Sequence, residues 1–210
     1  MTLHIRFTLR LFLRSGRWLA PLVLFSIWFS FAVAGSPPAL STAGALVPAF
    51  LACGSWITAA IGSMDDRNHR ELLAAAAGSP ARLHLARSLT SFAICFGATA
   101  ICVAFVAATL DEPDKSAIIV ASANGTALLG ASLLAVAIGS WLYPPLIKQR
   151  AVAVLAGLAA VIGVVLLPPI GATLKSLGNG HFSQTIVFGV VSGLVSVSAV
   201  FASSQMSNRI

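Results

Sequence analysis

Charged side chains are scarce in this chain of 210 residues, where Lys, Arg, Asp and Glu together make up only 9 %. A typical soluble domain contains about 25 % charged residues, whereas 58 % of this chain is hydrophobic and its mean hydropathy is +0.93. This composition excludes an ordinary water-soluble domain. The net charge of +7 does not indicate nucleic-acid binding, because that function requires a basic patch on a soluble surface.

Motifs for catalysis and for metal binding are lacking as well. The chain has no HExxH zinc motif, no GxSxG nucleophile motif and no GxxxxGKS/T phosphate-binding loop. Its three cysteines, Cys53, Cys95 and Cys102, show neither disulfide nor zinc spacing. We therefore expect no catalytic site, no metal site and no cofactor in this chain, and energy for uphill transport must come from another polypeptide.

Long hydrophobic stretches occupy most of the sequence. A bilayer core about 30 Å thick requires roughly 20 apolar residues for each helical span, and six windows of the sequence meet this requirement. These windows are residues 18–34, 40–63, 88–110, 116–143, 151–167 and 185–202. The predicted fold is an all-α integral membrane protein with six transmembrane helices, in which residues 1–210 form a single transmembrane domain.

The predicted spans contain no charged side chain, since all 13 Lys and Arg and all 6 Asp and Glu residues fall outside them. Transporters driven by protons or sodium usually keep an ionisable group within the membrane, so this absence argues against that mechanism. Asn124 and Thr126, in the outer part of the fourth window, are the candidates for a substrate path lined by hydrogen-bonding groups. The alternative is that these two residues bridge neighbouring helices.

Small residues recur at four-residue steps in three of the windows. They are Ala131, Ala135 and Gly139 in the fourth, Ala159 and Gly163 in the fifth, and Gly189 and Gly193 in the sixth. Small faces allow the backbones of membrane helices to approach closely. The pattern predicts a tightly packed bundle and identifies no particular partner.

The placement of the cations predicts how the chain is threaded, because cytoplasmic loops collect Lys and Arg. Counted on alternate sides of the six windows, eleven cations fall on one side and only Lys115 and Lys175 on the other. We expect a multi-pass protein of the cytoplasmic membrane with both termini in the cytoplasm. The first window follows a basic start, as a signal peptide does, but its removal would reverse this bias, so we interpret it as a retained span.

A helix is predicted over about residues 3–15, and four arginines in this helix and just after it fall on one side. These arginines are Arg6, Arg10, Arg14 and Arg17. At 100° per residue they fall within an arc of about 80°, apart from the apolar side chains of Ile5, Leu9 and Phe12. We expect an interfacial amphipathic helix whose guanidinium groups meet lipid phosphates and which turns into the membrane near Gly16. A basic flank that only fixes the topology is the alternative.

The segment DDRNHRELLAAAAGSPARLHLAR, residues 65–87, concentrates charge between the second and third windows. Its two aspartates can cap a helix at about residues 66–77, and Gly78 predicts where that helix ends. Ser79 and Pro80 then predict the N-cap and the first position of the next helix. This order indicates a short cytoplasmic helix hinged onto a long membrane helix, and the alternative is a solvated loop that only sets the topology.

A six-span chain with an amphipathic helix in front and with this charged helix between its second and third spans resembles the permease of type-2 ATP-binding-cassette (ABC) exporters. In that family the corresponding segment is the coupling helix, which docks into a groove of a separate ATPase subunit. The resemblance implies an ATPase interface formed by Asp66, Arg67, Arg70, Glu71, Leu72, Leu73 and Pro80. Family members frequently have Gly and Thr where this chain has His69 and Arg70, and many have large external domains that are missing here.

The resemblance also implies that ATP and Mg are bound by the partner ATPase and that a second permease copy, or a homologue, pairs with this chain as a dimer. Residues 168–183 fit the re-entrant helices of the family, with an ordinary surface loop as the alternative. The expected function is export of an amphipathic or hydrophobic substrate, such as a drug, a peptide or a lipid-like product. Two alternatives remain open, an ATP-independent channel or facilitator and a membrane scaffold that recruits a cytoplasmic partner.

Overall fold

The structure is a computed structural model that describes residues 2–34, 39–64, 67–108, 115–141, 150–166 and 182–207. These residues form the helices α1 (Thr2–Arg14), α2 (Leu19–Ala34), α3 (Ala39–Gly62), α4 (Arg67–Ala77), α5 (Pro80–Ala108), α6 (Lys115–Trp141), α7 (Arg150–Leu166) and α9 (Phe182–Ser207). The all-α prediction is confirmed for the described residues, in which there is no β-strand.

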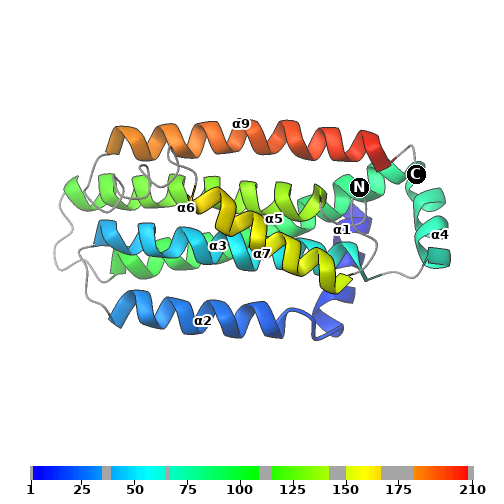
Figure 1. The fold of residues 1–210 in the computed structure, drawn as a ribbon, viewed down its shortest axis with the longest axis horizontal. Coiled ribbons are helices and arrows are strands. Elements are labelled where there is room, and N and C mark those ends of the chain that lie inside the picture. Colours follow the sequence, from blue (N-terminus) through cyan, green and yellow to red (C-terminus); the bar gives the residue numbers. More distant parts are fainter. Residues whose placement is uncertain are drawn as a thin grey trace.

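The long helices α2, α3, α5, α6, α7 and α9 run along the length of the molecule, and successive long helices run in opposite directions (Figure 1). The short helices α1 and α4 lie at one end together with the last turns of α9, and we call this the α4 end (Figure 1). At this end both α1 and α4 pack on α5.

Within the described part of the chain, four helices are each long and apolar enough to cross a membrane. Their qualifying segments are Ala45–Gly62, Pro80–Phe105, Asn124–Trp141 and Val187–Met206. A fifth is counted if α1 and α2, which are bent by 79° relative to each other, form one broken span. The described parts of α2 and α7, with 16 and 17 residues, lie at the short limit for a span. The structure thus supports a multi-pass membrane protein with four or five candidate spans, against the six that the sequence predicts.

Helix α6 occupies the centre of the bundle, with α3 on one side and α9 on the other. A methyl group added to Gly139 of α6 would lie 2.7 Å from the carbonyl oxygen of Ser55 in α3. A methyl group added to Gly189 of α9 would lie 2.7 Å from the carbonyl oxygen of Thr126 in α6. Neither position has room for a Cβ atom, so the backbones are in close contact, as small residues permit in membrane helices.

The predicted small-residue stripes differ in where they lie. Ala131 and Ala135 of α6 are completely buried, and Gly189 packs on α6 as described above. On α7, by contrast, Ala159 is exposed and a methyl group on Gly163 would have no neighbour within 4 Å. The stripes of α6 and α9 therefore build the core, whereas that of α7 faces outward.

The outer surface of the bundle is strongly apolar. Its exposed side chains include Leu22, Ile27 and Phe31 of α2, Phe96 and Ile101 of α5, Leu155 and Ile162 of α7, and Val190, Leu194, Val197 and Phe201 of α9. Soluble proteins rarely expose apolar surface on this scale, whereas lipid tails solvate it. The distribution of apolar side chains agrees with the membrane class that the composition predicts.

Candidate functional site at the α4 end

A sharp bend joins α1 to α2. Gly16 has a φ of +66°, in the left-handed region that favours glycine, and the two helices differ in direction by 79°. The indole Nε1 of Trp18 donates a hydrogen bond to the carbonyl oxygen of Leu13 at 3.0 Å and closes the bend. The turn occurs at the position that the sequence indicates, and it directs α1 across the end of the bundle.

Helix α1 has a buried side and a basic side. Phe12 is only 1 % exposed and packs with Ile61 at the end of α3. Arg6, Arg10 and Arg14 are all exposed, and Arg10 lies nearly opposite Phe12 around the helix at 100° per residue. The basic side of α1 therefore points away from the bundle.

Arg17 differs from the other three arginines because its side chain binds the protein itself. Its Nη1 donates a hydrogen bond to the carbonyl oxygen of Ser63 at 2.9 Å. Ser63 directly follows α3, and the last carbonyl groups of a helix have no partner within that helix. Arg17 thus caps α3. The sequence offered one signal for this difference, since Arg17 follows the bend at Gly16 rather than lying in α1.

The junction between α4 and α5 has the elements that the sequence predicts. Gly78 follows α4 with a φ of +80°, again a conformation that favours glycine. The Oγ of Ser79 accepts a hydrogen bond from the backbone N–H of Arg82 at 3.2 Å, which is an N-cap, and α5 begins at Pro80. From there α5 continues unbroken to Ala108, so that the basic end of the charged segment belongs to the long helix.

The structure describes some of the predicted ATPase-interface residues and not others. Asp66 lies outside the described residues, and for Arg67 and Arg70 the structure describes the helical backbone of α4 but not the side chains. Glu71 and Pro80 are exposed. Glu71, the polar member of this set whose side chain is described, therefore lies on the surface.

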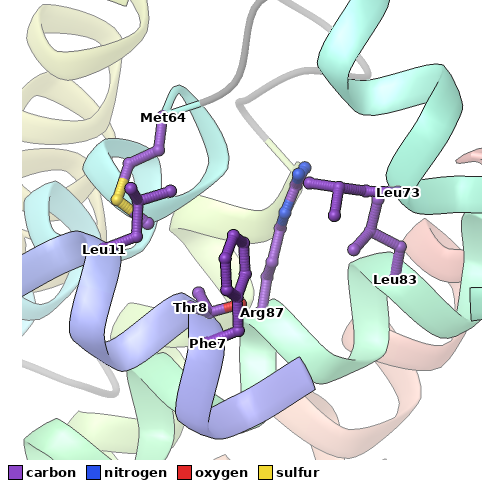
Figure 2. Close-up of a pocket in the computed structure, with 7 residues that line it drawn as sticks. All are labelled: Phe7, Thr8, Leu11, Met64, Leu73, Leu83 and Arg87. Carbon is purple, nitrogen blue, oxygen red and sulfur yellow. The ribbon is translucent and has the colours of Figure 1, made fainter. Parts of the chain in front are cut away.

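The two leucines of the predicted interface lie in different environments. Leu73 lines a cavity of about 10 Å³ where α1, α4 and α5 meet (Figure 2), a volume sufficient for about one water molecule. The cavity is lined by Phe7, Thr8, Leu11, Met64, Leu73, Leu83 and Arg87. Leu72, by contrast, is 68 % exposed. Leu73 thus packs toward the bundle, while Leu72 faces outward with Glu71.

Arg87 is a buried cation at this junction. Its side chain is 7 % exposed, and Figure 2 shows it beside the ring of Phe7 and extending toward Leu73. The sequence interpretation counted Arg87 among the loop charges that set the topology, but the structure places it inside the contact between α1, α4 and α5. The available signal was helical spacing, because Leu83 and Arg87 are four residues apart and share a face once α5 begins at Pro80.

A cluster of buried polar side chains joins α5, α6 and α9. The Nε2 of His84 lies 3.0 Å from the Oγ of Ser203, and this Oγ lies 3.5 Å from the Oγ of Ser140. All three side chains are buried. Nearby, Trp141 Nε1 donates a hydrogen bond to the carbonyl oxygen of Ala199 at 2.7 Å. The sequence interpretation missed this cluster, since nothing local to His84 indicates which serines it meets.

Asn124 and Thr126 belong neither to the cavity near Arg87 nor to the polar cluster around His84. Along α6 they precede Ser140 by 14 to 16 residues, which corresponds to about 21 to 24 Å of helix. Asn124 is 1 % exposed. Thr126 Oγ1 donates a hydrogen bond to the carbonyl oxygen of Ser122 at 2.8 Å, and its backbone faces Gly189 of α9. Thr126 therefore takes part in helix packing.

Comparison with protein families, with curated proteins and with solved structures gives no match for this chain. Among the described residues, no group of three or more His, Cys, Asp or Glu side chains is arranged to hold a metal ion. The site is therefore interpreted from its own geometry.

Proposed function

We propose that this chain is the transmembrane subunit of an ABC exporter, in which α2, α3, α5, α6, α7 and α9 serve as six spans and α4 serves as the coupling helix. The observation that carries the proposal is the two-sided packing of α4. Its Leu73 contacts the junction with α1 and α5, while Leu72 is exposed beside Glu71. An exposed leucine beside a carboxylate suits a contact with another protein.

The connection to α5 supports the same role. A partner that pushes on Leu72 would move a short helix whose only covalent link to α5 is the junction at Gly78 and Ser79. The contact through Leu73 and Arg87 would carry that movement into α1 and α5 as well. In this arrangement α4 and both termini face the cytoplasm.

The proposed partners follow from what the sequence does not encode. The chain contains no phosphate-binding loop, so ATP and Mg would be bound by a separate ATPase subunit. A second copy of this chain, or a homologue, would supply the other half of the pathway. Binding of ATP between the ATPase subunits would then bring the two α4 helices together and change the state of the permease pair.

The proposed cargo is amphipathic or hydrophobic. Among the described side chains of α6 and α9, the buried polar ones are serines and one asparagine, and none of the buried ones is charged. A highly charged solute in a membrane interior needs compensating charges, which these helices do not provide. A drug, a peptide or a lipid-like product fits this environment better.

The experiment compares the affinity-tagged chain, purified from its native membrane in mild detergent, with the double variant Glu71→Arg and Leu72→Asp. We expect a GxxxxGKS/T ATPase to co-purify with the parent chain and Mg-dependent ATP hydrolysis to accompany it. The double variant should lose both and should lose export of amphipathic dyes from inverted vesicles. Gln205→Asp, at an exposed site on the same end of the bundle, is the matched control and should retain all three.

Three results would overturn the proposal. Purification without any ATPase, together with unchanged dye export by the double variant, would remove the role of α4 as a coupling helix. Dye flux through proteoliposomes in the absence of nucleotide would instead favour a channel or facilitator. Capture of a partner that hydrolyses no ATP would favour a scaffold.

A further inference from the structure

We infer that His84 and Ser203 form a latch that ties the α4–α5 junction to the end of α9, so that these segments move as one unit. His84 lies in the second turn of α5, six residues after Gly78, and Ser203 lies in the last turns of α9. Their Nε2 and Oγ atoms are 3.0 Å apart. Both side chains are buried, so water does not compete for this hydrogen bond.

The hydrogen-bond directions follow from the neighbouring carbonyl groups. Ser203 Oγ donates its proton to the carbonyl oxygen of Val200 at 2.8 Å, and Ser140 Oγ donates to the carbonyl oxygen of Ala137 at 2.9 Å. A hydroxyl has one proton to donate and can accept further hydrogen bonds. Ser203 therefore accepts from His84, whose Nε2 carries a proton. A glutamine at position 84 has an N–H donor as well, whereas an alanine has none.

The position of His84 in α5 explains how the latch couples α9 to α1 and α4. Leu83 and Arg87, on either side of it, line the cavity shared with α1 and with Leu73 of α4. His84 contacts α9 instead. The first turns of α5 thus hold α4 and α1 through one set of side chains and α9 through another, and a continuous helix cannot move one set without the other.

A second buried hydrogen bond between helices, this one between two hydroxyl groups, offers a built-in comparison. Thr99 Oγ1 lies 3.1 Å from Ser132 Oγ and joins α5 to α6. Thr99 follows His84 by 15 residues in α5, or about 22 Å along the helix. This pair has similar chemistry and burial, but it holds the middle of the bundle rather than its α4 end.

The experiment measures the distance between spin labels on Leu72→Cys in α4 and Gln205→Cys in α9, with the full chain in lipid nanodiscs. Both positions are exposed, while Cys53, Cys95 and Cys102 are buried, so labelling can be restricted to the new sites. We expect one narrow distance distribution in the parent chain. His84→Ala and Ser203→Ala should each broaden it, while His84→Gln should keep it narrow.

Thr99→Val is the matched control and should lower the thermal midpoint by about as much as Ser203→Ala, roughly 2 °C for one hydrogen bond, without broadening the distribution. Unchanged distributions in both alanine variants would overturn the latch, and so would equal broadening by Thr99→Val. If one alanine variant fails to fold, the other decides.

The link between the latch and transport rests on the proposed function, but the spin-label distance measurement requires no ATPase. An intact latch without a co-purifying ATPase would therefore refute the function alone.

Discussion

The guanidinium of Arg17 is bound to the carbonyl oxygen of Ser63, 46 residues further along the chain, by a hydrogen bond of 2.9 Å. This contact joins the bend between α1 and α2 to the end of α3. It places a positive charge where the helix dipole is negative. It also gives a hydrogen-bond donor to a carbonyl group that has no partner within the helix. The position of α1 thus depends on a residue that lies outside it.

Arg17→Gln should destabilise the protein, because a hydrogen bond to a charged group contributes about 1.5 to 3 kcal/mol. We expect a fall in the thermal midpoint of several degrees and partial recovery in Arg17→Lys, which retains the charge but has a different shape. Thermal unfolding in detergent measures the effect. Arg14→Gln, at an exposed position in α1, should leave the midpoint almost unchanged. Equal effects at the two positions would contradict the capping role.

Gly189→Ala should disrupt the contact between α9 and α6. The added methyl group would lie 2.7 Å from the carbonyl oxygen of Thr126, and the backbone of α6 would have to shift to admit it. Overpacking of this kind costs about 1 to 3 kcal/mol, measured as a loss of thermal stability. Gly163→Ala has no such neighbour within 4 Å, so it should stay within about 1 kcal/mol of the parent chain. A larger loss of thermal stability in Gly163→Ala than in Gly189→Ala would show that α6 and α9 are not this close.

The exposed basic side of α1 should retain anionic lipid. Arg6, Arg10 and Arg14 are exposed on the side of α1 opposite Phe12, and each arginine near an anionic surface contributes about 1 kcal/mol of attraction. The triple change to glutamine should reduce the phosphatidylglycerol that stays with the purified protein, measured by native mass spectrometry. Arg82→Gln, exposed near the start of α5, is the control. Equal lipid retention in all three proteins would leave α1 with a topological role only.

Local signals in the sequence identified the helices and their ends well. Gly16, Gly78, Ser79 and Pro80 mark turns and caps whose conformations depend on the residues themselves, and the structure has them at the expected places. Hydrophobic length was less decisive. The windows 18–34 and 151–167 were already the shortest of the six, and the corresponding helices α2 and α7, with 16 and 17 described residues, are not among the four clear candidates.

The side-chain contacts of the candidate site could not be read from the sequence, because they join residues far apart in the chain. His84 and Ser203 are separated by 119 residues, and no local pattern distinguishes Ser203 from the other serines of α9. Leu72 and Leu73 are adjacent and chemically identical, yet Leu72 is exposed whereas Leu73 is half-buried against the cavity. Adjacent helix residues point about 100° apart, but which of the two meets α1 and α5 depends on how α4 packs in three dimensions.

The central position of α6 affects how the protein is made. α6 is synthesised before α9, and the two are separated by residues 142–181, so Thr126 and Gly130 enter the bilayer before the helix that covers them exists. Until α9 arrives, the face of α6 that Gly189 and Ser192 later cover lacks its native partner. Membrane insertion and completion of the core are thus separate events for this chain, and a ribosome that stalls between α6 and α9 would leave an inserted but unfinished protein.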